Sequence, residues 1–199
     1  GGYSILPLRN TEGKVTHFAS IQRDITEYKK LEQDLQILCR TDPLTTAANR
    51  RAFNEILSQE FSRFKRSQKE YALIMIDLDH FKSINDQHGH SVGDQVLIEV
   101  TERCKDNIRV HDILARLGGE EFCILLPYTD SDQAKKVAER LREKIEIKPI
   151  IVDGLRVKVT ISVGISLVST GDEDGHQAME RADQKLFQAK ESGRNQICA

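Results

Sequence analysis

Acidic side chains at two places in this sequence have the spacing of a metal site. An apolar run over residues 71–76 is typical of a strand buried on both faces, and it ends in Asp77-Leu78-Asp79. Because side chains alternate along a strand, Asp77 and Asp79 are expected to point to the same side, where one or both could bind a hard cation. From this run alone, an equally good interpretation is that the two aspartates simply end the strand in solvent.

The second acidic pair belongs to Gly118-Gly119-Glu120-Glu121, which lies between apolar runs over residues 113–117 and 122–126. The two glycines favour a tight hairpin turn. If this hairpin pairs beside the strand over residues 71–76, Asp77 and Glu120 come together, and two such carboxylates repel unless a cation or a proton neutralises them. The alternative is an exposed turn that carries two incidental glutamates.

Basic side chains near the C-terminus are candidates for binding phosphate. Lys190 and Arg194 flank Gly193, a residue type that favours the end of a helix, and Lys82 is a further candidate. Basic residues at a helix C-terminus more often interact with its terminal carbonyls, so this pair alone does not establish a phosphate site.

The elements that must position these residues alternate between helix and strand patterns. We expect helices at residues 50–69, 92–108, 131–147 and 175–191, and strands at residues 71–78, 113–117, 122–126, 157–166 and near 196. One strand pair is a tight hairpin, so the sheet is mixed. The predicted fold class is α+β, with helices flanking a central, mainly antiparallel sheet.

The first 40 residues predict a separate arrangement. Residues 4–8 and 15–21 form a strand-turn-strand pattern, and because a lone hairpin is marginally stable in water we expect it to be part of a truncated domain. Residues 25–40 are polar and helical, with Tyr28, Leu31, Leu35 and Leu38 at the spacing of a coiled-coil seam. Packing of this helix on its own domain is the alternative. Pro43 ends the helix.

Composition and charge exclude several classes of protein. The 199 residues carry a net charge of -2, which lacks the excess of positive charge typical of a nucleic-acid-binding protein. The basic residues around Arg63 are interpreted as a solvated helix face. No run approaches the roughly 18 apolar residues of a membrane span. We expect a cytoplasmic domain without membrane contact. The four widely spaced cysteines predict reduced thiols, with Cys123 in the core, and neither a disulfide nor a zinc site.

The ordered motifs resemble those of the GGDEF-domain diguanylate cyclases, whose signature stands here as Gly118-Gly119-Glu120-Glu121-Phe122. The resemblance runs from about residue 41 to the C-terminus. The other matching segments are residues 42–45, 49–51, 77–86, 89–94, 116, 162–164, 182–183 and 189–195.

The resemblance implies a palm-like sheet related to nucleotidyl cyclases and polymerases, and the condensation of two GTP into cyclic di-GMP and two pyrophosphates. It assigns two Mg²⁺ or Mn²⁺ ions per active site to Asp77, the Leu78 carbonyl and Glu120, with Glu121 as a supporting catalytic carboxylate. Asn85 and Asp94 correspond to the positions that bind the guanine edge. The remaining substrate positions are Lys82, Lys190 and Arg194 for the phosphates and Leu44 for an apolar wall of the base pocket.

The same resemblance implies a homodimer and product inhibition. One site holds one GTP, so two domains must face each other for each nucleotide to attack the other. Residues 1–25 resemble the C-terminal hairpin of a PAS sensor, residues 26–41 a coiled-coil signalling helix, and residues 42–199 the cyclase domain. Arg109 and Asp112 match an inhibitory Arg-x-x-Asp site for cyclic di-GMP, which Arg140 would complete from a second domain.

One departure from the family pattern is Thr46-Ala47, where Gly-Leu is usual. Threonine is stiff and does not readily adopt a positive φ, so we expect the local backbone or the base pocket to differ. The alternative function is a catalytically weak or inert domain that binds GTP or cyclic di-GMP. A cyclase for another nucleotide is disfavoured by Asn85 and Asp94.

Overall fold

The computed structural model describes residues 2–29 and 39–199. The chain divides into two compact units, Gly1–Cys39 and Arg40–Ala199. None of the helices in the described residues has the length and apolar character needed to cross a bilayer.

The first unit is the predicted hairpin, formed by β1 (Gly2–Arg9) and β2 (Val15–Arg23) in antiparallel register. Its turn is closed by the Asn10 side chain, which accepts hydrogen bonds from the backbone N–H groups of Glu12 and Lys14, and Gly13 supplies a φ of 80°. Apolar side chains on this hairpin are at least half exposed, namely Ile5, Leu6, Leu8 and Phe18.

Residues 26–29 and 39–40 are helical. The predicted coiled-coil seam of Leu31, Leu35 and Leu38 lies outside the described residues, so the coiled coil stays a prediction.

The second unit is built on a six-stranded sheet in the order β10-β9-β4-β6-β5-β3. The central strand β4 pairs antiparallel with β6 and β9, β5 pairs antiparallel with β6, and the short outer strands β3 and β10 pair parallel. The predicted mixed, mainly antiparallel sheet is confirmed. The strands are β3 (Ala48–Asn49), β4 (Tyr71–Leu78), β5 (Ile113–Gly118), β6 (Glu121–Pro127), β9 (Ile161–Leu167) and β10 (Ile197–Cys198).

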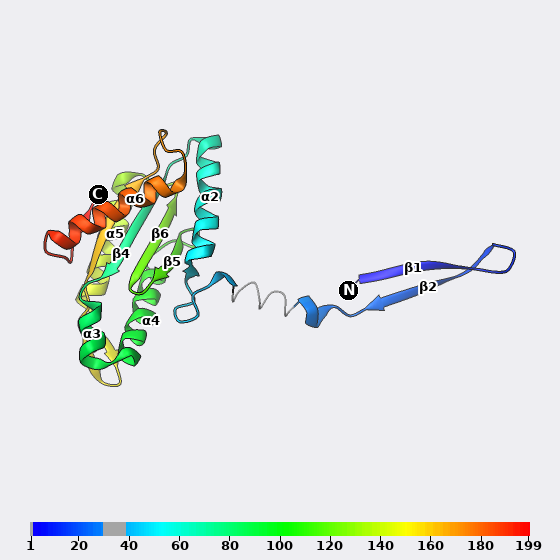
Figure 1. Cartoon of the computed structure of the whole chain (residues 1–199), viewed down its shortest axis with the longest axis horizontal. Coiled ribbons are helices and arrows are strands. Elements are labelled where there is room, and N and C mark those ends of the chain that lie inside the picture. Colours follow the sequence, from blue (N-terminus) through cyan, green and yellow to red (C-terminus); the bar gives the residue numbers. More distant parts are fainter. Residues whose placement is uncertain (1, 30–38) are drawn as a thin grey trace. The chain divides into compact units, whose positions relative to one another are not determined.

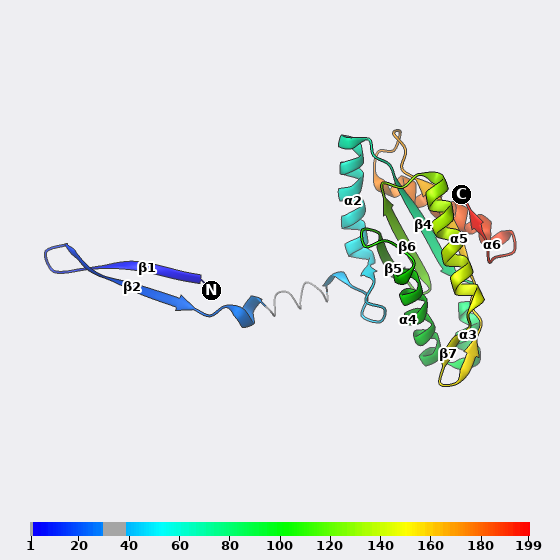
Figure 2. The ribbon, with the colours of Figure 1, turned by 180° about the vertical axis from the view of Figure 1, so that it is seen from behind.

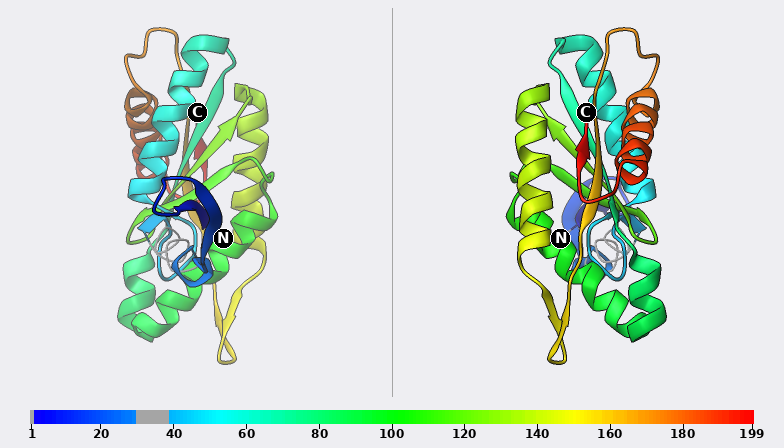
Figure 3. Two further views of the ribbon diagram at one scale, coloured as in Figure 1. Left: turned by 90° about the vertical axis from the view of Figure 1, so that its right-hand side faces the viewer. Right: turned by 90° about the vertical axis from the view of Figure 1, so that its left-hand side faces the viewer.

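Helices cover both faces of this sheet (Figures 1, 2 and 3). The helices α2 (Arg50–Ser67) and α6 (Gly175–Glu191) lie on one face, and α4 (His90–Asp106) and α5 (Ser131–Ile147) lie on the other. Because successive side chains of β4 point to opposite faces, Leu73 and Met75 join the core under α2 and α6, whereas Ile74 and Ile76 join the core under α4 and α5. This explains the unbroken apolar run over residues 71–76.

Side chains at the helix starts account for several element boundaries. Asn49 accepts a hydrogen bond from the backbone N–H of Ala52 at the start of α2, and Asp130 forms a reciprocal capping box with Gln133 at the start of α5. The Asp174 side chain caps α6 by accepting from the backbone N–H groups of His176 and Gln177. These caps place α2, α5 and α6 close to their predicted positions.

Two stretches differ from the sequence-based expectation. The helix α3 (Phe81–His88) was not predicted, because it is short and polar, with buried side chains only at Phe81 and Ile84; Gly89, at a φ of 84°, separates it from α4. The strand predicted at residues 157–166 begins later, at Ile161, and residues 158–160 are in no strand. Val157 instead ends a small hairpin of β7 (Ile150–Val152) and β8 (Leu155–Val157), turned at Asp153-Gly154 with positive φ at both residues.

Candidate functional site

The two acidic segments meet at one end of the sheet because β6 pairs directly with β4. Asp77 lies opposite Glu121 on β6, and the Leu78 N–H donates to the Glu120 carbonyl at 3.4 Å. In the turn that joins β5 to β6, Gly118 and Gly119 have positive φ, of 151° and 52°. The expected juxtaposition is present, but the cross-strand partner of Asp77 is Glu121 rather than Glu120.

The surroundings of the Asp77 carboxyl group raise its pKa and so disfavour its charged form. Burial raises its pKa, the Lys190 ammonium at 2.8 Å from Oδ2 lowers it, and the negative charges of Glu120 and Glu121 raise it further. The three carboxylates face two cationic groups, Lys190 and the Arg50 guanidinium 3.9 Å from Glu121, so this end of the sheet keeps an excess of negative charge. That excess favours cations.

Asp79 has a different role from the one its spacing suggested. Its carboxylate accepts from the hydroxyls of Thr160 at 2.8 Å and Ser162 at 2.6 Å and from the backbone N–H of Asn195 at 3.0 Å. Since β4 ends at Leu78, strand alternation no longer sets the direction of Asp79. Its oxygens are used to hold the start of β9 and the C-terminal loop together.

The acidic end of the sheet fits a cation that is shared with a substrate. Within residues 2–29 and 39–199, no three His, Cys, Asp or Glu side chains converge closely enough to form a metal site by themselves. Mg²⁺ typically binds one or two protein carboxylates together with substrate phosphates and water. The buried Asp77, with Glu120 and Glu121 beside it, supplies that kind of donor set.

The C-terminal loop places basic side chains beside this acidic group. Lys190 lies in the last turn of α6, and Gly193 follows the helix with a φ of 114°, after which the Arg194 N–H donates to the Ala189 carbonyl. Asn195 is held by Arg142 of α5 through a 2.9 Å hydrogen bond. The loop therefore follows a defined path, with an exposed Arg194 at its bend.

The residues expected to bind the base lie on the α3–α4 helix pair. Asn85 is half-buried in the last turns of α3, and its backbone carbonyl accepts from the Gly89 N–H at 2.8 Å. Asp94 is exposed in the second turn of α4. Leu44 is partly buried against the core on this face, and Lys82 is exposed near the start of α3.

Two arginines hold the signature hairpin in place. Arg50 Nε donates to the Leu117 carbonyl at 2.7 Å, and its Nη2 lies 3.9 Å from Glu121 Oε2. Arg116 Nε donates to the Gly119 carbonyl at 2.9 Å, and its Nη1 donates to Asp42. Both connect the turn to the segment that enters this unit. Sequence reasoning placed Arg50 in a motif but gave it no role, because its partner is distant in the chain.

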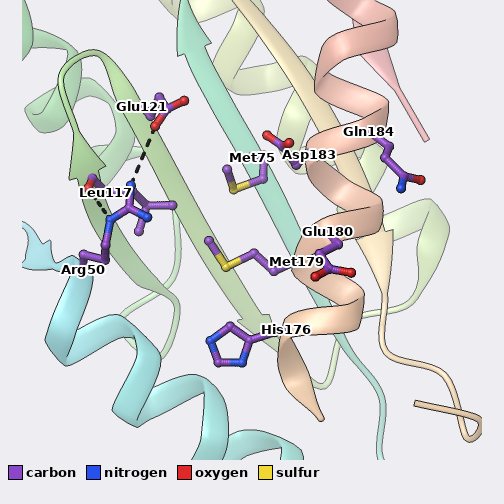
Figure 4. Close-up of a pocket in the computed structure, with 9 residues that line it drawn as sticks. All are labelled: Arg50, Met75, Leu117, Glu121, His176, Met179, Glu180, Asp183 and Gln184. Atoms are coloured by element: carbon purple, nitrogen blue, oxygen red, sulfur yellow. Dashed lines mark hydrogen bonds and ion pairs between the residues drawn. The ribbon is translucent and has the colours of Figure 1, made fainter. Parts of the chain in front are cut away.

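A cleft of about 440 Å³ lies on the α6 side of the hairpin, between β6 and α6 (Figure 4). Met75 and Met179 line its apolar part, and Arg50 and Glu121 lie on the side of the hairpin. Of the predicted site residues only Glu121 lines it, whereas the cleft lining lacks Asp77, Glu120, Asn85, Asp94 and Lys190. We therefore place the candidate nucleotide site at the ends of β4 and β6 and at α3–α4 rather than in this cleft.

The predicted inhibitory residues lie together in a second region. Asp112 Oδ2 accepts from the Arg109 backbone N–H at 2.7 Å; burial raises the pKa of Asp112, and Arg109, His111 and Arg140 lower it. Arg140 is near enough to Asp112 in the same chain to lower its pKa, and its role from a second domain stays a prediction. Arg140 also donates to the Asn107 carbonyl at 2.6 Å.

Arg63 was wrongly interpreted as part of a solvated helix face. It lines a cleft of about 580 Å³ together with Arg109 and Asp112, its guanidinium lies 3.9 Å from the ring centroid of Tyr128, and it is paired with Glu60. The helical charge pattern of α2 carried no signal for this, since the facing loop comes from residues more than 40 positions away.

Thr46 does adopt the backbone conformation that glycine favours, with a φ of 59°. The expectation that threonine would avoid it is wrong. The turn is closed by the Thr46 N–H on the Asp42 carbonyl at 2.9 Å, and Lys105 Nζ donates to the Thr46 hydroxyl at 2.9 Å. These contacts compensate for the unfavourable φ.

The fold is an α+β domain with a mainly antiparallel sheet, and one end of that sheet carries acidic side chains beside the basic C-terminal loop. Residues 39–196 match the family described as "Diguanylate cyclase, GGDEF domain". The match covers well over half of the chain, and the chain therefore belongs to the GGDEF family of diguanylate cyclase domains.

Relatives and a solved structure agree with this family. The chain is 39% identical over 178 residues to the diguanylate cyclase DgcP of Pseudomonas aeruginosa, across 89% of this chain and 26% of DgcP. It is 35% identical over 187 residues to the cyclic di-GMP phosphodiesterase NbdA of the same organism, across 94% of this chain and 24% of NbdA. It spans about a quarter of the length of these two relatives.

The structure resembles the coiled coil and GGDEF domain of DgcB from Caulobacter crescentus in complex with c-di-GMP. The TM-score is 0.80, with 30% sequence identity over 87% of this chain and 93% of that chain.

Proposed function

We propose that this chain condenses two molecules of GTP into cyclic di-GMP and two pyrophosphates. The observation that carries the proposal is the meeting of Asp77, Glu120 and Glu121 at the ends of β4 and β6, with Lys190 2.8 Å from Asp77. Family membership supports the same reaction. The proposed metal ions, two Mg²⁺ or Mn²⁺ held by Asp77, the Leu78 carbonyl and Glu120, would lower the pKa of the attacking 3′-hydroxyl and stabilise charge on the α-phosphate.

The protein's own groups orient the substrate in this proposal. Lys190 and Arg194 neutralise the phosphates from the C-terminal loop, and Lys82 does so from α3. Asn85 and Asp94 bind the guanine edge, since a carboxylate accepts from guanine N–H donors that adenine lacks, and Leu44 packs against the base. Glu121 would sustain the negative potential that favours cation binding at this end of the sheet.

Catalysis requires two copies of the chain. Each site binds one nucleotide, and the product contains two bonds, each formed by the 3′-hydroxyl of one nucleotide on the α-phosphate of the other. A two-fold homodimer brings the two sites together for both steps. Residues 26–41 are proposed as the signalling helix that sets their angle, and residues 1–25 as the end of a PAS-like sensor.

The test is incubation with GTP and Mg²⁺, followed by separation of the nucleotides and measurement of oligomeric state by light scattering. Cyclic di-GMP and pyrophosphate are expected at a 1:2 ratio. Glu120→Ala should lower the rate by about 10²-fold or more while leaving the thermal unfolding midpoint within a few degrees. A dimeric wild-type sample that yields no cyclic dinucleotide would contradict the proposal.

The second candidate function is a binding domain for GTP or cyclic di-GMP without cyclase activity. The relative NbdA is named for hydrolysis of cyclic di-GMP, and Thr46 replaces the usual glycine in this chain. Binding of GTP without product formation in the same assay would support this candidate.

A further inference from the structure

Gly93 lies where α4 packs closely against α3. It is buried, and a Cβ atom added to it would lie 1.9 Å from Asn85 Oδ1, 3.0 Å from Asn85 Cγ and 3.2 Å from Phe81 Cζ. Ordinary contacts of a Cβ atom are 3.4 Å or longer. Any side chain at this position therefore requires the Asn85 amide oxygen to move by about 1.5 Å, which is enough to break a hydrogen bond at normal length.

We propose that Gly93 is a positioning residue for base recognition, because the Asn85 amide occupies the space that a side chain at position 93 would fill. This inference rests on the proposed function, in which Asn85 and the neighbouring Asp94 bind the guanine edge. Both groups must meet the same edge of one planar ring, so a displaced Asn85 loses its contact while Asp94 keeps its own.

The contact at Gly93 differs in kind from that at another close-packed glycine. A Cβ on Gly164 would meet backbone atoms, the Ala182 carbonyl oxygen at 2.1 Å and the Leu186 nitrogen at 2.2 Å, so it would displace α6 from the sheet. The nearest obstacle at Gly93 is the end of a half-buried side chain, which can rotate while the helices stay in place. Gly93 therefore serves the position of Asn85 more than the packing of the fold.

Helix energetics lead to the same conclusion. Glycine inside a helix is less favourable than alanine by about 0.5–1 kcal/mol. Without the close contacts to Asn85 and Phe81, alanine would be the better residue at this position in α4. The shorter of these contacts is the one to the Asn85 amide, the group that binds the base in the proposed function.

The test is equilibrium binding of a GTP analogue with a methylene group in place of the α,β-bridging oxygen, which cannot lose pyrophosphate, and of the matching adenine analogue. Gly93→Ala should weaken binding of the guanine analogue about threefold to tenfold, the loss of one hydrogen bond. Binding of the adenine analogue should not change. The thermal unfolding midpoint should stay within a few degrees, because alanine favours the helix while the buried Phe81 ring must shift slightly to accept the new Cβ.

A double-mutant cycle identifies the route of the effect. If Gly93 acts through Asn85, Gly93→Ala should add nothing to the loss already caused by Asn85→Ala. Gln95→Ala, on the exposed side of the same helix, is the matched control and should bind both analogues like the wild type.

The possible failures are distinguishable. Equal binding of the guanine analogue by wild type and Gly93→Ala, or additive losses in the cycle, overturns the role of Gly93 and leaves the proposed function standing. A wild-type protein that does not prefer guanine over adenine overturns both.

Discussion

At the residue scale, Asp77 combines burial with charge. Its pKa is raised by burial and by Glu120 and Glu121 in spite of the Lys190 ammonium, so the ionised form is disfavoured in the folded protein. A carboxylate in this setting contributes to function at some cost in stability.

Replacing Asp77 by asparagine should separate these two contributions. Asp77→Asn keeps the shape and removes the buried charge, so the unfolding midpoint at pH 7 should equal or exceed that of the wild type, while cyclic di-GMP formation should be lost. Paired thermal melts and turnover assays measure both. A lower midpoint would mean that the pair with Lys190 stabilises the fold by more than burial of Asp77 costs.

Thr46 offers a test of backbone strain. Thr46→Ala and Thr46→Gly both lose the hydrogen bond from Lys105, but only glycine is relaxed at a φ of 59°. The glycine variant should therefore be more stable than the alanine variant by about 1 kcal/mol, measured by urea unfolding. Equal stabilities would show that the turn does not keep this φ in solution.

At the element scale, the Asp172 carboxylate is central to the hydrogen bonds that hold the connection between β9 and α6. Asp172 accepts from Arg181 Nη1 at 2.7 Å and Nη2 at 2.8 Å and from the Ser169 N–H at 2.8 Å, while Lys65 donates to its carbonyl. Arg181 is chiefly responsible for the lowered pKa of Asp172. This connection determines where α6 begins on the sheet. It therefore also influences where Lys190 lies, in the last turn of the same helix.

The lowered pKa predicts an acid dependence of stability. A carboxylate whose pKa is lower in the folded state stabilises the fold above its unfolded pKa of about 3.9, and the contribution is lost as the pH falls through the folded pKa. Asp172→Asn should lower the unfolding free energy at pH 7 by about 1–3 kcal/mol. The difference from the wild type should shrink below about pH 4. Melts from pH 7 to pH 3 that stay parallel would contradict this linkage.

At a larger scale, the proposed active site and the proposed product site lie in two different regions of the second unit. The proposed active site lies at the ends of β4 and β6, and the proposed product site lies around Arg109, beside the exit from α4. The sheet strand β5 runs from one region to the other, since it begins at Ile113 and ends at Gly118. A ligand in the Arg109 cleft would therefore contact the strand that carries the signature turn, since Ile113 lines that cleft.

Removing Arg109 should uncouple the two regions. Arg109→Ala should keep the initial rate of cyclic di-GMP formation and abolish the slowing that added product causes in the wild type. Arg66→Ala, an exposed position of α2 outside this cleft, is the matched control. Inhibition that persists in Arg109→Ala would place the regulatory site elsewhere.

Much of this architecture follows from local sequence. Some signals act over only a few residues and can be recognised without a structure. These are the run over residues 71–76, the paired glycines before Glu120 and the caps of α2, α5 and α6. The α+β sheet, the hairpin and the buried Cys123 were predicted on that basis and are confirmed. The motifs also determined the family, which the comparisons confirm.

Only the tertiary structure decided which side chains meet. The β4–β6 register places Glu121 opposite Asp77, and the three donors that hold Asp79 are 81, 83 and 116 residues away along the chain. The position of Arg63 in the Arg109 cleft and the space left by Gly93 for Asn85 have the same origin. Spacing along a chain specifies the face on which a side chain lies, whereas its partners depend on strand register and helix packing between distant segments.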